Sequence, residues 1–249
     1  MSGHSKWSTI KRKKEKIDGA RAKVFTKIGR ELAVAVKEGG GPDPRSNSKL
    51  KDCIAKAKAA NVPNDNIERI IKKAAGDGDE NRYENIVYEG YGPNGIAVIV
   101  EALTDNRNRT AGDIRHYFDK FGGNLGTNGC VSFLFSRKGV LVIEKEGLSE
   151  DKVMEDCLEA GASDFQADED VFEIYTEPDD FSGVLADLEA KGYEFVSAEI
   201  EMVPTTYTKL TDEESISKMQ HLLDALEDSD DVQNVWHNWE NADEEEADQ

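Results

Sequence analysis

The chain has 249 residues, 38% of them hydrophobic and 33% charged, which is enough for two or three domains with cores of their own. No run of about 18 apolar residues is present, and no apolar stretch follows the basic N-terminus, so neither a membrane span nor a signal peptide is expected. Three widely spaced cysteines favour neither a disulfide framework nor a zinc site, and they suit a reducing, cytoplasmic location.

Charge is distributed very unevenly along the chain. Residues 1–75 contain 19 Lys and Arg against 8 Asp and Glu, whereas residues 76–249 contain 12 against 43. A polyanion would therefore be attracted by one end of the protein and repelled by the rest of its surface. This asymmetry predicts nucleic-acid binding by the N-terminal segment. The alternative is that basic and acidic domains merely neutralise each other.

The N-terminal segment has the periodicity of helices. Apolar residues at a spacing of three to four predict helices at residues 21–37, near residues 46–60, and from Asn64 to Gly76. Asp65 and Glu68 resemble a capping box at the start of the third helix. The expected unit is a basic helical domain at residues 1–78, followed by a Gly- and Asp-rich linker.

From residue 84 the pattern becomes that of a sheet. Strands are expected at 86–88 and 96–100, joined by a turn that contains a literal G-x-G-x-x-G. Because a strand and not a helix follows this run, it indicates a hairpin and not a dinucleotide site. A helix is expected at 110–121 and a further strand at 131–135.

The rest of the chain predicts a ferredoxin-like domain inserted in another domain. The elements expected in the order βαββαβ are strand 139–144, helix 149–160, strands 164–167 and 171–176, helix 180–190 and strand 194–202. A helix at 211–227 and a strand at 232–236 would complete the sheet begun at 86–135. The predicted fold class is α+β multidomain. Its domains are 1–78, a discontinuous α+β domain of 82–136 plus 203–239, an inserted domain of 137–202, and a disordered acidic tail of 240–249.

The N-terminal basic cluster is the main candidate site. Clustered cations can neutralise phosphates, and an aromatic ring can stack on a base. The alternative is a solvated helix face, with Trp7 anchoring the terminus on the bundle. The candidate nucleic-acid-binding residues here are Lys6, Trp7, Lys11, Arg12, Lys13, Lys14, Lys16, Arg21, Lys23 and Lys27, and Arg30 extends the same surface.

Two other segments are ambiguous. Arg107 and Arg109 lie between a strand and a helix, where they could contact phosphate or pair with carboxylates nearby, while Asp105 or Asn108 caps the helix. Residues 122–129 contain enough glycine to approach a partner backbone closely, or they form a flexible connection after the helix.

Motifs for catalysis are absent from the sequence. The four histidines have no metal-ligand spacing, and neither a nucleophile elbow nor a phosphate-binding loop is present. We therefore expect a protein that is not an enzyme and that uses no cofactor, metal or small-molecule substrate.

Several motifs spread along the chain carry a family resemblance. They are Gly3-His4-Ser5-Lys6-Trp7, Lys11-Arg12-Lys13-Lys14, Lys23-Val24-Phe25-Thr26-Lys27, Tyr88-Glu89-Gly90-Tyr91-Gly92-Pro93, the run from Thr104 to Thr110, and Gly122-Gly123-Asn124-Leu125-Gly126. With them the chain strongly resembles the YebC family over nearly its whole length. The resemblance implies a helical N-terminal domain, two α+β domains around a cleft, and no enzymatic activity. Bacterial members are described as DNA-binding transcriptional regulators that also act on stalled ribosomes. Mitochondrial relatives look like translational activators of cytochrome c oxidase subunits.

The sequence, with this resemblance, favours a ribosome-associated translation factor that docks on ribosomal RNA and relieves stalled elongation. The alternative is a DNA-binding transcriptional regulator at promoter DNA. Lys dominates the basic region, whereas a reader of duplex sequence usually presents Arg, Asn or Gln to the major groove. This difference favours the ribosome only weakly, because Lys-rich patches also bind DNA. A third possibility, a module that binds only protein, predicts no salt-dependent affinity for nucleic acid.

Overall fold

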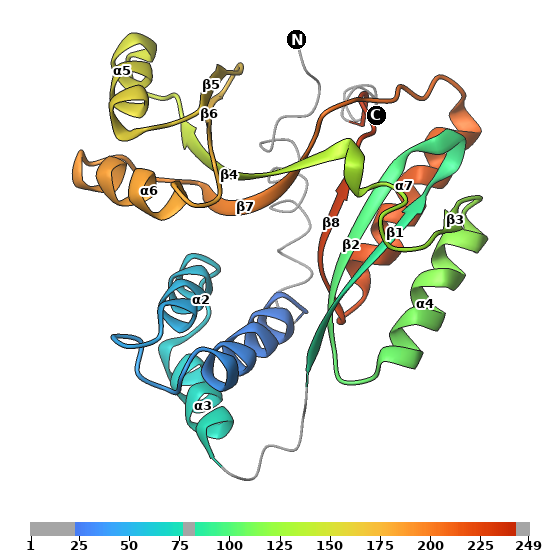
Figure 1. The fold of residues 1–249 in the computed structure, drawn as a ribbon, viewed down its shortest axis with the longest axis horizontal. Helices are drawn as coiled ribbons and strands as arrows, with labels where there is room; N and C mark the ends of the chain where they lie inside the picture. Colours follow the sequence, from blue (N-terminus) through green and yellow to red (C-terminus); the bar gives the residue numbers. More distant parts are fainter. Residues whose placement is uncertain (1–22, 77–82, 243–249) are drawn as a thin grey trace. The chain divides into compact units, whose positions relative to one another are not determined.

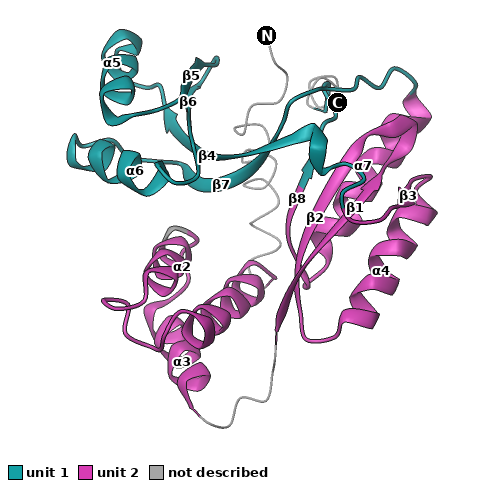
Figure 2. Ribbon diagram, viewed as in Figure 1, with its two compact units in different colours: residues 1–15, 129–212, 236–249 teal, residues 16–128, 213–235 magenta. Residues whose placement is uncertain are grey.

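The structure is a computed structural model, and it describes residues 23–76 and 83–242. Contacts within the chain divide it into two compact units (Figure 2). Among the described residues, unit 2 holds residues 23–76, 83–128 and 213–235, and unit 1 holds residues 129–212 and 236–242. The chain thus leaves unit 2, builds most of unit 1 and returns to unit 2, as expected for an insertion.

The N-terminal part of unit 2 is a helical bundle (Figure 1). It consists of a helix at residues 23–38, α2 (Ser48–Ala59) and α3 (Asn64–Ala75). Ile28, Leu32 and Val36 recur every four residues and are buried against Leu50 and Ile67. We call residues 23–76 the bundle. All three predicted helices are confirmed, but the capping box is wrong. Pro63 is the residue that precedes α3, and no side chain caps this helix. The carbonyl of Pro63 accepts from the amide of Asn66 at 2.9 Å.

The rest of unit 2 contains an antiparallel sheet with the strand order β3-β1-β2-β8. Its strands are β1 (Glu84–Tyr91), β2 (Ala97–Thr104), β3 (Asn124–Leu125) and β8 (Val232–His237), and its helices are α4 (Arg107–Lys120) and α7 (Glu213–Asp228). The side chains of β2 are almost all buried, as its continuous apolar sequence requires. The strand at 232–236 joins the sheet begun at 86, as predicted.

The glycine-rich hairpin is confirmed, and packing explains its glycines. The turn between β1 and β2 contains a 3-10 turn at Pro93–Gly95. A Cβ on Gly90 would lie 2.6 Å from the backbone oxygen of Asn124 and 2.8 Å from the ring of Phe118. Residues 122–129, which the sequence indicated either approach another backbone closely or form a flexible connection, contain strand β3, which pairs with β1 at this point. The glycines admit a neighbouring strand of the same chain.

Unit 1 contains the ferredoxin-like elements in the predicted order. They are β4 (Phe135–Glu144), α5 (Glu150–Ala160), β5 (Asp164–Ala167), β6 (Val171–Thr176), α6 (Phe181–Ala190) and β7 (Ser197–Pro204). The sheet is antiparallel with the order β5-β6-β4-β7, which is that of a ferredoxin-like sheet. Leu141, Phe172 and Ile174 of the sheet pack against Val153 and Leu188 of the two helices.

Two predictions near the ends of these elements need correction. The strand expected at 131–135 is a 3-10 turn at Ser132–Leu134, and the ring of Phe133 is 70% exposed. Phe135 then begins β4 and pairs with Pro204, so this segment extends the sheet of unit 1. At the other end, the predicted tail of 240–249 contains Asn241, which is buried and bonds to both backbone groups of Leu210. The exact domain boundaries placed at 78, 137 and 202 remain predictions.

Candidate nucleic-acid interface

The bundle carries the excess of positive charge that the sequence predicts. Its 54 described residues contain 12 Lys and Arg against 6 Asp and Glu. Some of these cations are paired inside the bundle: Lys56 lies 3.0 Å from Glu31, and Lys49 lies 3.5 Å from Glu38. Five exposed cations have no ion pair in the described part of the chain. They are Lys51, Lys58, Arg69, Lys72 and Lys73.

Helix α3 presents polar side chains on the side opposite its core contacts. Ile67 and Ala74 are buried in the bundle, which fixes the orientation of the helix. Asn66, Arg69 and Lys73 follow one another at a spacing of three and four residues, so they share one face. Arg69 and Lys73 are exposed and Asn66 is half-buried. This face can donate hydrogen bonds to phosphates or to base edges.

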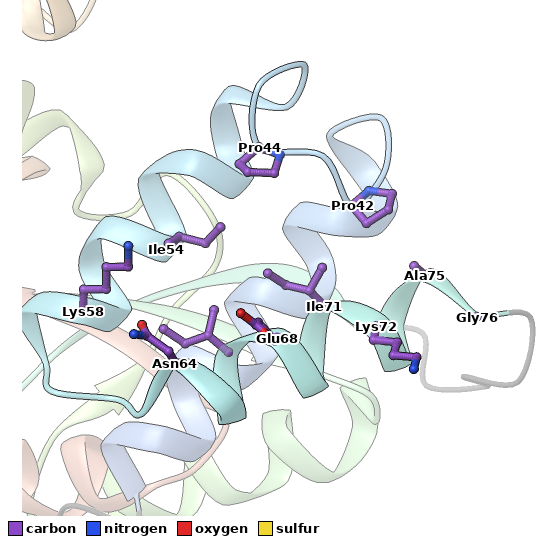
Figure 3. A pocket seen from close by; sticks show the side chains of 11 residues that line it. Pro42, Pro44, Ile54, Lys58, Asn64, Glu68, Ile71, Lys72, Ala75 and Gly76 are labelled. Carbon is purple, nitrogen blue, oxygen red and sulfur yellow. The ribbon is translucent and has the colours of Figure 1, made fainter.

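A groove of about 800 Å³ lies between α2, α3 and the loop that joins the first helix to α2 (Figure 3). Its lining combines apolar side chains with the amines of Lys58 and Lys72. The lining residues are Pro42, Pro44, Ile54, Lys58, Asn64, Ile67, Glu68, Ile71, Lys72, Ala75 and Gly76.

Asn47 holds the loop beside this groove. Its buried amide nitrogen donates to the carbonyls of Ala35 and Gly41 at 2.7 and 2.8 Å. Its carbonyl oxygen accepts from the amide of Leu50 at 3.0 Å, which caps the N-terminus of α2. One side chain therefore joins the end of the first helix to the start of the second. The sequence analysis missed this residue, although an Asn directly before a helix is a recognised capping signal.

The structure describes only part of the predicted site. Lys23, Lys27, Arg107 and Arg109 fall within the described residues. The other predicted residues, Lys6, Trp7, Lys11, Arg12, Lys13, Lys14, Lys16 and Arg21, lie outside them. Their role remains a prediction from the sequence.

Lys23 and Lys27 contact the C-terminal end of α7. Lys23 Nζ lies 2.6 Å from a carboxylate oxygen of Asp228, and Lys27 Nζ donates to the carbonyl of Glu227 at 2.7 Å. The last carbonyls of a helix lack partners within the helix and carry partial negative charge, so lysine amines are suited to this position. Lys23 and Lys27, which were predicted to contact phosphate, thus contact another part of unit 2 in this structure.

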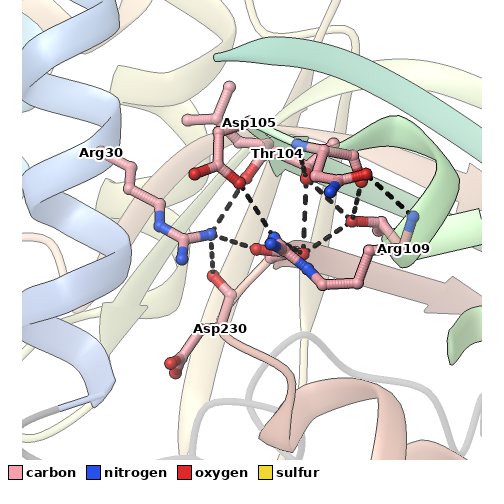
Figure 4. Close-up of polar contacts among 9 residues, drawn as sticks. Arg30, Thr104, Asp105, Arg109 and Asp230 are labelled. Atoms are coloured by element: carbon pink, nitrogen blue, oxygen red, sulfur yellow. Dashed lines mark hydrogen bonds and ion pairs between the residues drawn. The ribbon is translucent and has the colours of Figure 1, made fainter. Parts of the chain in front are cut away.

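Arg30, one turn further along the same helix, contacts the segment that follows α7 (Figure 4). Its Nη1 donates to the carbonyls of Asp230 at 2.9 Å and Leu103 at 3.2 Å, and to the carboxylate of Asp231 at 2.5 Å. The guanidinium also lies 5.5 Å from the centre of the ring of Tyr83. Arg30 joins the bundle to the ends of two strands in the sheet of unit 2.

Asp231 is the acceptor at the centre of this network. Besides Arg30, it accepts from Arg109 Nη2 at 2.8 Å and from the Thr110 hydroxyl at 2.6 Å. Burial raises the pKa of this carboxyl, but the hydrogen bonds from Arg109, Thr110 and Arg30 outweigh it and lower the pKa to about 2. The carboxylate is therefore charged at neutral pH, and its partners are fixed in sequence segments far apart.

The two arginines predicted at 107 and 109 differ in their surroundings. Arg109 pairs with Asp105 at 3.0 Å as well as with Asp231, so the carboxylate alternative describes it. Arg107 has a longer contact of 3.9 Å with Glu84, and its side chain is 69% exposed. The helix is capped by Asn106, whose side chain accepts from the amide of Arg109, and neither Asp105 nor Asn108 caps it.

Chemistry of other kinds finds no support among the described residues. Groups of three or more His, Cys, Asp and Glu able to hold a metal ion do not occur in the described ranges. Cys53, Cys130 and Cys157 form no disulfide among the described residues, and burial raises the pKa of Cys53 and Cys157 to about 11, which disfavours the reactive thiolate. In the ranges searched, no helix is long and apolar enough to cross a membrane.

These features define an α+β protein in which a basic helical bundle precedes two sheet-containing parts. Family models match almost the whole chain: "TACO1/YebC protein N-terminal domain" matches residues 5–77, and "TACO1/YebC second and third domain" matches residues 83–239. The chain belongs to the TACO1/YebC family.

Similar proteins span the full chain. A "Probable transcriptional regulatory protein" of Acetivibrio thermocellus is 64% identical over 240 residues, which cover 96% of this chain and 99% of the relative. A protein of the same description from Ruminiclostridium cellulolyticum is 61% identical, with 99% of each chain covered. The crystal structure of a conserved hypothetical protein from Aquifex aeolicus matches with a TM-score of 0.82 at 46% identity, covering 91% of this chain and 93% of that one.

Proposed function

We propose that this protein is a non-enzymatic regulator of gene expression that binds nucleic acid through its bundle. The observation that carries the proposal is the set of five exposed cations on α2 and α3 that have no ion pair in the described part of the chain. Cations held on a rigid bundle can displace the counterions of a phosphate backbone without first breaking internal pairs. The basic N-terminal cluster would extend this surface.

Transcriptional regulation through DNA is the candidate that the relatives' names favour, since the curated relatives described above are called probable transcriptional regulatory proteins. The exposed face of α3 adds a physical reason. Asn66 and Arg69 are residue types that read base edges in a major groove, and α3 follows α2 after the short connection at residues 60–63. In the sequence, the predominance of Lys over Arg in the bundle favoured the ribosome weakly over such a face.

Ribosome binding is the second candidate. The groove beside α3 pairs two lysines with an apolar floor, and such a surface suits an unpaired RNA strand whose bases can contact apolar side chains. The inserted ferredoxin-like segment, residues 137–202, carries 20 Asp and Glu against 5 Lys and Arg. That segment would be repelled by nucleic acid, so contact with either ligand would be confined to the basic part of the chain.

One pair of variants tests the interface. In Arg69→Gln/Lys73→Gln, two phosphate contacts would be lost, so the slope of log K against log salt should fall by about 1.8 for duplex DNA or about 1.4 for single-stranded RNA. Arg115→Gln/Lys120→Gln removes the same charge from α4, outside the bundle, and should leave the slope nearly unchanged. Equal slopes for the two double variants would rule out α3 as the interface.

Co-sedimentation with ribosomes then separates the two candidates. The wild type and the Lys11/Arg12/Lys13/Lys14→Ala variant would be run on gradients at low and moderate salt, alongside binding to duplex DNA. Co-migration that the variant loses, with weak duplex affinity, would favour the ribosome. Tight duplex binding by a protein that stays at the top of the gradient would favour transcriptional regulation.

A further inference from the structure

The cations of the bundle that contact α7 are of the kind that would also bind a phosphate backbone. We define the α7 docking contact as Lys23, Lys27 and Arg30 of the bundle with the end of α7 and Asp231. The three cations recur at a spacing of four and three residues on one side of the helix at 23–38. Their partners are oxygens of Glu227, Asp228, Asp230 and Asp231, together with the carbonyl of Leu103.

The acidic side of this contact resembles a polyanion. Residues 224–231 contain five carboxylates in eight positions, and three carbonyls of the same segment accept from the bundle. Helix α7 ends without a basic residue in its last turn, although Glu227 and Asp228 are placed where a helix favours cations. Lys23 and Lys27 of the bundle supply the positive charge that the last turn of α7 lacks.

The contact is also weak enough to exchange. The Lys23–Asp228 pair is largely exposed, with 43% and 72% of the two side chains accessible. Exposed pairs of this kind are screened by salt and contribute little, so a ligand that offers a row of phosphates can compete for the lysines. Arg30, by contrast, is 17% exposed and is held by three acceptors and the ring of Tyr83.

We propose that nucleic acid and the carboxylates at the end of α7 compete for the same bundle cations, so that binding a phosphate backbone releases Lys23 and Lys27 from the α7 docking contact. This inference rests on the proposed function and adds a means of regulating that site. In the free protein Lys23 and Lys27 neutralise the end of α7, and in the complex they contact phosphates. The bound and free proteins then differ in whether Lys23 and Lys27 contact the end of α7, while Arg30 keeps its contact with Asp231.

Zero-length crosslinking tests the competition on the full chain. A carbodiimide joins a lysine amine to a carboxylate in direct contact, so Lys23 and Asp228 should become linked in the free protein. Saturating oligouridylate or duplex DNA should lower the yield of this crosslink several-fold, as measured by mass spectrometry. The Lys191–Glu159 pair, with a distance of 2.8 Å in the acidic part of unit 1, serves as an internal control whose yield should not change.

The outcomes separate the two proposals. If an oligonucleotide binds and the Lys23–Asp228 crosslink forms in undiminished yield, the competition is disproved while the proposed function stands. If neither oligonucleotide binds, both proposals fail.

A matched pair of variants gives a second test. Asp228→Asn removes one competitor for Lys23 and should tighten oligonucleotide binding about twofold to fivefold. Asp113→Asn makes the same charge change on the neighbouring helix α4, at an exposed position that has no ion pair within the described residues. General electrostatics would tighten binding equally in both variants, and that result would overturn the inference. Thermal unfolding of the two variants should coincide, since neither side chain is buried.

Discussion

Each unit has a carboxylate that accepts hydrogen bonds from cationic side chains and a hydroxyl. The two carboxylates connect different parts of the chain. Asp156 on α5 of unit 1 accepts from Lys191 Nζ at 2.6 Å, from the Tyr193 hydroxyl at 2.7 Å and from Lys152 Nζ at 3.0 Å. These partners are at most 37 residues away and belong to the same small fold. Asp231 of unit 2 accepts from Arg30 and Arg109, of which Arg30 is 201 residues away in the bundle.

The difference shows what each network stabilises. The Asp156 network ties α5 to the turn after α6, and it strengthens a fold that already has a core of its own beneath those helices. The Asp231 network joins the bundle, which has an apolar core of its own, to the end of α7 and the start of α4 in the rest of unit 2. Beside the Asp231 network lies the exposed Lys23–Asp228 pair, for which an external polyanion could compete, whereas the Asp156 network connects elements of one small fold.

The sharpest way to break this comparison is to remove the acceptor of unit 2. Asp231→Ala removes the carboxylate that accepts from Arg30, Arg109 and the buried hydroxyl of Thr110, and removing one partner of a largely buried ion pair is strongly destabilising. We expect a loss of about 3 kcal/mol in the free energy of unfolding, measured by urea denaturation. Asp113→Ala, on exposed α4 surface, should change it by less than about 0.5 kcal/mol. Equal losses would show that Asp231 has no special role.

Acid should weaken the same network in a defined pH window. The pKa of Asp231 is lowered from 3.8 to about 2, because the hydrogen bonds from Arg109, Thr110 and Arg30 outweigh the opposing effect of burial. A carboxyl with a lowered pKa stabilises the folded state above its unfolded pKa and loses that contribution as the pH falls through the folded one. About 2 kcal/mol should therefore be present above pH 4 and disappear between pH 4 and 2.

Comparison with Asp231→Asn isolates this contribution from the many other carboxylates. The variant cannot titrate at position 231, so the difference in unfolding free energy between wild type and variant should shrink as the pH falls from 5 to 2.5. Hydrogen bonds from Lys191, Tyr193 and Lys152 also lower the pKa of Asp156, and that effect is common to both proteins and cancels. A constant difference across this range would contradict the pKa given to Asp231.

The regular elements could be predicted from the sequence because local periodicity determines them. The apolar run at 96–100, the βαββαβ order of unit 1 and the three helices of the bundle each follow from residues adjacent in sequence. The strand expected at 131–135 failed because apolar residues there do not share one environment: Val131 is buried whereas Phe133 is exposed. Which of these two side chains is buried depends on where the 3-10 turn places them in the folded protein.

The positive charge of the candidate site could be predicted from the sequence, but the residues that its cations contact could not. The sequence predicts a basic N-terminal domain, and five exposed cations of α2 and α3 carry part of that charge, while the predicted phosphate contacts stay predictions. Which face of the first helix meets α7 depends on packing between segments about 200 residues apart. Lys23 and Lys27 therefore looked like free cations in the sequence, and the acidic run at 224–231 gave no sign of its partners.

Removing one donor should sharpen the comparison in unit 1. Tyr193→Phe deletes a hydroxyl that bonds to Asp156, and two lysines still satisfy the carboxylate. The expected loss is about 1 kcal/mol of unfolding free energy, smaller than for Asp231→Ala because no charge is left without a partner. Tyr83→Phe removes a hydroxyl that makes no hydrogen bond to any described residue and keeps the ring beside Arg30, so it should cost less. Identical losses would mean that the Tyr193 hydroxyl contributes nothing.

The smallest effects are expected at the exposed outer cations, where the two networks should behave alike. Lys23 is 43% exposed and Lys152 is 62% exposed, so each pair with its carboxylate is screened by solvent. Lys23→Gln and Lys152→Gln should each lower the unfolding free energy by less than about 1 kcal/mol, and the loss should vanish near 1 M salt. A clearly larger, salt-resistant loss for Lys23→Gln would mean that the bundle is fixed on α7 too firmly for a polyanion to displace it. A similar, salt-sensitive loss at both positions would mean that the exposed lysines do not distinguish the two networks. The difference would then lie in the less exposed partners, because Arg30 is distant in sequence from Asp231 whereas Tyr193 is close in sequence to Asp156.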